Sequence, residues 1–168
     1  ARRKEGPEKL CGLAKYIDDH EFPGCLHGVT LRSSIPRGRI KSISFDPSFP
    51  WSECVVARAE DIPGRNVVAL IEDDQPLLAD GKVMHPHEPI LLVGHADRQK
   101  AYEALKHIKV EYEPFEPVLT IAESLEKKHV IYGSNNVFKE FLIEKGDIHA
   151  AFARADHIIE GEYRVPHQ

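Results

Sequence analysis

Apolar and polar positions along this chain follow two different periods. Residues 25–32 and 39–45 alternate apolar and polar side chains, as half-buried strands do. In the second stretch Ile40 and Ile43 are out of phase, which predicts a β-bulge there. Residues 97–108 instead repeat apolar side chains at helical spacing, namely Ala101, Ala104, Leu105 and Ile108. The two periods together predict a domain of the α+β class.

Capping and turn residues place further elements. Asp97 is a suitable N-cap for that helix, and a strand is expected directly after it over 108–112. A shorter helix is predicted over 120–127, with Thr120 as its N-cap and Glu123 at the capping-box position. Other strands are predicted over 54–57, 66–71 and 88–93.

The last third of the chain has a pattern of its own. Residues 130–136 are polar and contain glycine, which predicts a linker. Beyond it we expect a strand over 137–143, a helix over 147–155 and a strand over 157–165. Such a small unit buries little surface alone, so its sheet is expected to continue in residues outside this sequence. Both ends look cut, and we interpret the chain as a fragment of a larger protein rather than a processed small one.

Composition and charge exclude two classes of partner. The chain has 168 residues, with 22 Lys and Arg against 27 Asp and Glu and a net charge of −5. No basic stripe with interleaved aromatic residues is present, so no nucleic-acid partner is expected. The longest apolar runs, such as residues 89–93, are too short to span a bilayer, so no membrane association is expected.

The cysteines indicate a reducing compartment. Cys11, Cys25 and Cys54 are odd in number and widely spaced, which argues against a disulfide framework and favours a cytoplasmic location. No Cys-x-x-Cys pair occurs, so this chain is not expected to hold an iron–sulfur cluster or a structural zinc ion. Cys11 and Cys54 have no nearby base in the sequence and are expected to be buried, unreactive thiols.

The most metal-like pattern is a group of histidines. His85 and His87 would point the same way on a strand, and His95 follows shortly after. A third ligand at fixed geometry is not evident, and a surface connection rich in His and Pro explains the same residues. We therefore predict no metal site, while a small His-rich metal-binding protein remains an alternative.

Other polar groups suggest catalysis only weakly. Ser33 and Ser34 with His27 would make a hydrolase site, but the Gly-x-Ser-x-Gly turn of such enzymes is absent. The adjacent acids at 18–19 and 73–74 point in different directions and are expected in solvated turns. No phosphate-binding glycine loop occurs, so no catalytic residue is assigned to this chain.

Several motifs in a fixed order resemble one enzyme family. Residues 10–19 (LCGLAKYIDD) resemble the opening of the large subunit of molybdenum hydroxylases, the xanthine dehydrogenase and aldehyde oxidase family, with Cys11 in place of a Thr. Residues 61–66 (DIPGRN) are similar to the family's Asp-Ile-Pro-Gly-x-Asn turn, the most specific piece. Residues 110–118 (VEYEPFEPV) and the segment from Gly146 onward also resemble the family, in the same order.

The resemblance implies a fold and a division of the chain. Residues 1–130 would form an α/β-hammerhead domain of mixed strands and two or three helices. Residues 131–168 would form a linker and the first strand–helix–strand of a truncated molybdopterin-binding domain. Gln168 matches, by order, a family glutamine that lies beside the molybdenum and hydrogen-bonds an oxygen ligand, so it is the candidate cofactor-binding residue.

The resemblance also implies a reaction and partners. The complete enzyme would hydroxylate a purine, an aldehyde or an N-heterocycle with water as the oxygen source. It would use a molybdenum–molybdopterin cofactor, with iron–sulfur clusters and in some members FAD in partner domains or subunits. The expected partners are the remainder of the molybdenum subunit and an iron–sulfur subunit or domain, in an oligomeric parent enzyme. This chain would be structural and inactive alone; a stand-alone protein-interaction module is the alternative.

Overall fold

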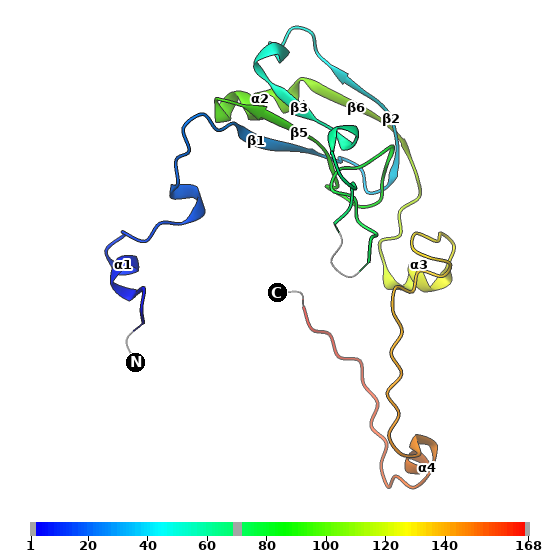
Figure 1. Ribbon diagram of the computed structural model, residues 1–168. Helices are drawn as coiled ribbons and strands as arrows, with labels where there is room; N and C mark the ends of the chain where they lie inside the picture. The colour runs from blue at the N-terminus through cyan, green and yellow to red at the C-terminus, as the bar shows by residue number, and fades with distance from the viewer. Residues whose placement is uncertain (1–2, 69–71, 167–168) are drawn as a thin grey trace.

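Two small antiparallel sheets form the core of the protein. The computed structural model describes residues 3–68 and 72–166. One sheet has the order β1–β5–β3, with bounds His27–Arg32, Pro89–His95 and Val55–Ala57. The other has the order β4–β2–β6, with bounds Lys82–Val83, Gly38–Phe45 and Ile108–Pro114. The predicted α+β class is confirmed (Figure 1).

One helix covers the first sheet and leads into the second. Helix α2 (Arg98–Lys106) packs on β1 and β5, and β6 begins two residues after it ends. The Asp97 side chain caps it, accepting hydrogen bonds from the backbone N–H of Gln99 at 2.7 Å and of Lys100 at 3.2 Å. The predicted helix, its cap and the strand after it are all confirmed.

The core is built from β-branched and small side chains. Strand β5 is buried at most positions because one face packs on α2 and its two edges pair with β1 and β3. Ala101 and Ala104 of α2 are fully buried, and their small size lets the helix approach the sheet closely. The fully buried side chains of the core are Val83, Ile90, Leu91, Val93, Ala101 and Ala104.

The second sheet contains the predicted irregularity. The pairing of β2 with β6 shifts register between Ile40 and Ser42, which confirms the bulge expected from the sequence. Strand β3 of the first sheet, at Val55–Ala57, confirms the strand predicted over 54–57. Helix α3 (Ile121–Glu126) begins after Thr120 with the expected capping box, in which the Glu123 carboxylate accepts from the Thr120 backbone N–H.

Two extended arms leave this core. We call residues 3–26 the N-arm; it contains α1 (Gly6–Leu10) and a 3-10 helix over Ile17–Asp19. We call residues 118–166 the C-arm; it contains α3 and α4 (Ile148–Ala153). Figure 1 shows both arms projecting away from the sheets. No helix within 3–68 and 72–166 is long and apolar enough to cross a membrane.

Three predicted strands are corrected. The segment 66–71 makes only an isolated bridge between Val68 and Gln75 in its described part, and residues 69–71 lie outside the described residues. Segments 137–143 and 157–165 are not strands, although the helix predicted between them forms as α4. A strand requires a neighbour to pair its backbone N–H and C=O groups, and none lies beside these segments in the described part of the chain.

Candidate functional site

A carboxylate, an imidazole and an ammonium group meet at the start of α2. Glu53 Oε2 lies 2.9 Å from Lys100 Nζ and 3.4 Å from His95 Nε2. His95 is 5 % exposed, and its Nδ1 accepts a hydrogen bond from the Asp97 N–H at 2.7 Å. Because Nδ1 accepts that hydrogen bond, a ring proton lies on Nε2, which donates a hydrogen bond to the Glu53 carboxylate. The hydrogen bond from Lys100, and secondarily that from His95, lowers the pKa of Glu53.

This cluster joins three elements of the fold, and none of its three side chains is a nucleophile. Cys54 is the adjacent thiol, and burial together with the charge of Glu53 raises its pKa, so the unreactive protonated form is favoured. Both nitrogens of His95 are already engaged. The cluster therefore ties the 3-10 helix over Trp51–Glu53 to β5 and α2. Glu53 is 42 residues from His95 and 47 from Lys100 in the sequence, so no local motif indicates the cluster.

The histidines of the alternative metal-binding interpretation do not form a metal site in the described part of the chain. His85 and His87 are exposed and lie in the turn after β4, not on a strand, and His87 has a φ of 62°. Glu88 is 2 % exposed, and its carboxylate accepts hydrogen bonds from the backbone N–H groups of Met84 and His85 in that turn. Among the residues that the structure describes, no three His, Cys, Asp or Glu side chains come together to hold a metal ion.

The other sequence candidates also have structural roles. Ser33 is 1 % exposed, and its hydroxyl donates to the Ile35 carbonyl at 2.7 Å, which closes a turn. The acids at 18–19 lie in the 3-10 turn of the N-arm, as expected. The expectation that Cys11 is buried is wrong, because the N-arm that carries it extends away from the core; Cys54 is half-buried.

A contact between the Asp46 carboxylate and the His107 imidazole fixes the end of β2. Asp46 accepts a hydrogen bond from the Ser48 N–H at 2.9 Å and lies 3.1 Å from His107 Nδ1. The His107 ring stacks on Phe49 with the centroids 4.8 Å apart, and the Trp51 indole donates to the Asp46 carbonyl at 2.7 Å. The hydrogen bonds from Ser48, and then the one from His107, lower the pKa of Asp46 to about 2.

This pair predicts a pH dependence of stability. A folded-state pKa near 2, below the ordinary 3.8, means that ionised Asp46 stabilises the fold above about pH 4. That contribution is lost as the pH falls toward 2. We expect Asp46→Asn to unfold at lower urea concentration than the wild type at pH 7, with the gap between midpoints closing from pH 4 to pH 2. A gap that stays constant over this range would contradict the assignment.

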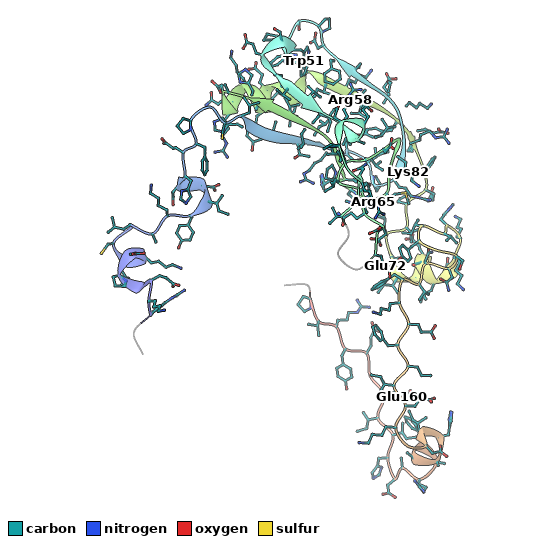
Figure 2. The ribbon with its side chains drawn as sticks, in the orientation of Figure 1. Trp51, Arg58, Arg65, Glu72, Lys82 and Glu160 are labelled. Atoms are coloured by element: carbon teal, nitrogen blue, oxygen red, sulfur yellow. The ribbon has the colours of Figure 1, made fainter. Side chains whose placement is uncertain are left out.

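The arms carry most of the exposed large apolar side chains. Figure 2 shows the side chains around Glu160 standing away from the core residues Trp51 and Arg58. In the N-arm the exposed large apolar residues are Leu10, Leu13, Tyr16, Ile17, Phe22 and Leu26. In the C-arm they are Leu119, Ile121, Leu125, Val130, Val137, Phe138, Phe141, Leu142, Ile143, Ile148, Phe152, Ile158, Ile159, Tyr163 and Val165.

Such exposure indicates an interface. Ile143, Ile159 and Val165 are 93 %, 90 % and 89 % exposed, and burying apolar surface is worth roughly 25 cal/mol for each Å². Large contiguous apolar patches on a protein mark sites that contact another surface. The arms, which carry most of the exposed large apolar side chains, are therefore the candidate functional site.

The loop that follows α3 in the C-arm is held by side-chain hydrogen bonds. The Asn136 side chain accepts hydrogen bonds from the backbone N–H groups of Ile131 at 2.7 Å and Tyr132 at 3.2 Å. Its amide donates to the carbonyls of Ser124 at 3.2 Å and His129 at 3.0 Å. Four hydrogen bonds from one side chain hold the loop after α3 in one shape, so the extended part begins from a fixed point.

Open grooves lie at both arm roots. A groove of about 630 Å³ lies between the N-arm, β1 and α2, and Phe22, Arg98 and Tyr102 are part of its lining. Another of about 670 Å³ lies between the connection around Asp74–Lys82 and the C-arm residues Ile131 and Tyr132. Lys82, labelled in Figure 2, is part of its wall. Each groove extends the surface of its arm onto the core.

Gln168, the one residue expected at the cofactor, lies outside the described residues. Its place beside the molybdenum stays a prediction.

The family model described as "Aldehyde oxidase and xanthine dehydrogenase, a/b hammerhead domain" matches residues 11–116. The nicotinate dehydrogenase large molybdopterin subunit of Eubacterium barkeri is 33 % identical over 93 % of this chain and 37 % of its own length. A probable xanthine dehydrogenase subunit from Bacillus subtilis is 29 % identical over 99 % of this chain and 23 % of its own length. This chain thus spans well under half of either relative.

A solved structure supports the same family. The aldehyde oxidoreductase from Desulfovibrio gigas superposes with a TM-score of 0.80 at 26 % identity, over 92 % of this chain and 19 % of that chain. A match over 92 % of the chain takes in much of the arms as well as the core. The hammerhead fold and the family expected from the sequence motifs are confirmed. This chain belongs to the aldehyde oxidase and xanthine dehydrogenase family and contains its a/b hammerhead domain.

Proposed function

We propose that this chain works as the hammerhead portion of the molybdopterin-binding large subunit of a molybdenum hydroxylase. The complete enzyme would hydroxylate a purine, an aldehyde or an N-heterocycle, with water supplying the oxygen. The observation that carries the proposal is the pair of apolar arms, which would be covered only in a larger assembly. Their likeness to part of a much longer relative supports the same interpretation.

The chain's own role in that enzyme would be structural. The compact sheets provide a rigid body, and the arms fasten it to the remainder of the molybdenum subunit and hold that part against an iron–sulfur subunit or domain. Residues 1–130 would form the hammerhead and residues 131–168 the first part of the molybdopterin-binding domain. A stand-alone interaction module is less well supported, because a self-contained module would cover the C-arm with its own residues.

The described residues contain no group of three His, Cys, Asp or Glu side chains that could hold a metal ion, and the cysteines lie on separate elements. The molybdenum–molybdopterin group, the iron–sulfur clusters and any FAD would be held mainly by other parts of the enzyme. Within this chain, Gln168 remains the proposed contact, since a neutral amide donates hydrogen bonds to a metal-bound oxygen without competing as a ligand.

Charged substitutions in the C-arm test this function. We expect the double variant Phe141→Glu, Ile159→Glu to lose most of the molybdenum that copurifies with the tagged wild-type chain from its own source. Both side chains are exposed, at 75 % and 90 %, so the core should unfold at the wild-type temperature. Lys139→Glu is the matched control, because it changes charge on the same arm without removing apolar surface. Equal molybdenum content in the double variant would contradict the proposal, and so would a wild-type chain that carries none.

A further inference from the structure

The groove that ends at Ile131 and Tyr132 contains a nearly buried carboxylate with one unused oxygen. We call it the C-arm groove; its volume is about 670 Å³, and Glu88, which is 2 % exposed, is part of its lining. Glu88 Oε2 accepts hydrogen bonds from the backbone N–H groups of Met84 and His85. The other oxygen, Oε1, accepts none from the residues that the structure describes, and it is not sealed from solvent. Because nearly buried carboxylate oxygens are normally hydrogen-bonded, this one indicates a donor that comes from outside.

Side-chain hydrogen bonds fix both walls of the C-arm groove. On one side the Asn66 amide donates to the Leu78 carbonyl at 2.7 Å, and the Leu78 N–H donates back to Asn66 Oδ1 at 3.0 Å. On the other side Asn136 holds the backbone of Ile131 and Tyr132, as described above. Walls that are already held lose little further freedom when a ligand enters, which favours binding.

The charges in the C-arm groove favour a cation. Its ionisable lining residues are three acids, one lysine and one histidine, namely Asp74, Asp80, Glu88, Lys82 and His85. Within 3–68 and 72–166, none of these five side chains takes part in an ion pair. The lining also contains the aromatic side chain of Tyr132. A planar guanidinium stacks on an aromatic ring and donates several hydrogen bonds, whereas an ammonium group is more strongly hydrated.

We propose that the C-arm groove binds the guanidinium group of an arginine side chain from the polypeptide that covers the C-arm. The inference rests on the proposed function, under which that polypeptide is the remainder of the molybdenum subunit. Ile131 and Tyr132 belong to the C-arm, so a partner that lies along the arm also reaches the groove. Glu88 Oε1 accepts from a guanidinium N–H in a charge-assisted hydrogen bond, and the two aspartates add to the attraction.

Binding of N-acetyl-arginine amide to the 168-residue chain tests the chemistry of the groove. NMR titration to about 50 mM extends well beyond the millimolar dissociation constant that a single ion pair provides. We expect saturable shifts of the amides at 84–88 and 131–132. N-acetyl-citrulline amide has a similar shape without the charge and should bind at least about tenfold more weakly. An arginine compound that causes no saturable shift, or binds no better than its citrulline analogue, would overturn the proposal.

Glu88→Gln separates the charge of this residue from its role in the fold. Glutamine keeps an oxygen that accepts from the Met84 and His85 N–H groups, so the variant should melt with the wild type but bind the arginine compound at least about tenfold more weakly. Asp80→Asn, at an exposed position, is a second variant expected to weaken binding. Glu103→Gln makes the same charge change on α2, outside the groove, and should bind as the wild type does. Wild-type affinity in Glu88→Gln would contradict the assignment.

The molybdenum-containing assembly, purified from its own source, tests where the arginine comes from. Phenylglyoxal modifies accessible arginines, and mass spectrometry locates them in the sequence. We expect an arginine of the remaining subunit to react at least about tenfold faster in the Glu88→Gln assembly than in the wild type, because its ion pair is lost. Equal rates at every arginine would overturn the proposed source. An absence of any molybdenum assembly with the wild type would instead count against the proposed function, while the titration of the isolated chain still decides whether the groove binds a guanidinium group.

Discussion

Leu91→Ala is expected to lower the free energy of unfolding by roughly 2–5 kcal/mol, the usual cost of a cavity at a fully buried leucine. Leu91 is 0 % exposed in the central strand β5, and it pairs across the sheet with Leu31 of β1. Its cross-strand neighbour Leu31 is itself held in β1, so the site cannot easily collapse. Urea unfolding followed by circular dichroism measures the difference.

The adjacent residue provides the control for that substitution. Leu92 points to the opposite face of β5 and is 41 % exposed. Leu92→Ala should therefore cost under about 1 kcal/mol, because it removes apolar surface that is partly hydrated already. Equal losses in the two variants would mean that β5 is not packed with the register described.

Gly38→Ala is expected to destabilise the second sheet by roughly 1–3 kcal/mol. A Cβ atom at this position would lie 2.6 Å from the Glu113 carbonyl oxygen and 3.1 Å from the Pro114 Cα, both in the backbone of β6. A flexible side chain could move aside, but a paired strand cannot do so without losing its hydrogen bonds. The first residue of β2 must therefore be glycine for the two strands to approach.

Gly28→Ala is the matched control. Gly28 also lies in a strand, β1, but nothing stands within 4 Å of its added Cβ. We expect the Gly28→Ala variant to melt close to the wild-type temperature. The Gly38→Ala variant should melt clearly below that temperature. Wild-type stability in Gly38→Ala would show that β2 and β6 do not approach as closely as described.

Most of the core could be predicted from local pattern alone. The helix after Asp97, its cap and the strand after it follow from apolar spacing and one side-chain acceptor. The bulge near Ile40 follows from a break in alternation. These features depend on residues a few positions apart, so the order of side chains contains the necessary information.

Features that depend on distant residues could not be predicted. The contact of Glu53 with His95 and Lys100, and that of Asp46 with His107, join residues brought together only by the fold. The two strands wrongly predicted in the C-arm have a different cause. Val137–Ile143 has the composition of a strand, but a strand forms only when another strand is present to pair with it. The sequence pattern predicts a sheet shared with other residues, and that sheet stays a prediction.

The motifs identify the family because their order is specific even though each one is short. The Asp61–Asn66 turn and the stretch near residues 10–19 lie in different parts of the structure, one beside β3 and one in the N-arm. Neither forms a chemical site, which explains why the reactive groups alone indicate no activity. The family resemblance supplies what the side-chain chemistry of this chain cannot.

Native mass spectrometry of the protein purified from its own source, with molybdenum measured in the same sample, tests the central claim most directly. The account predicts a species much heavier than 19.0 kDa that contains this sequence, the rest of a large subunit and molybdenum. The arms would be covered in that species. A lone 19.0 kDa species without molybdenum would contradict the proposed role in a molybdenum hydroxylase, while the family and the hammerhead fold would stand.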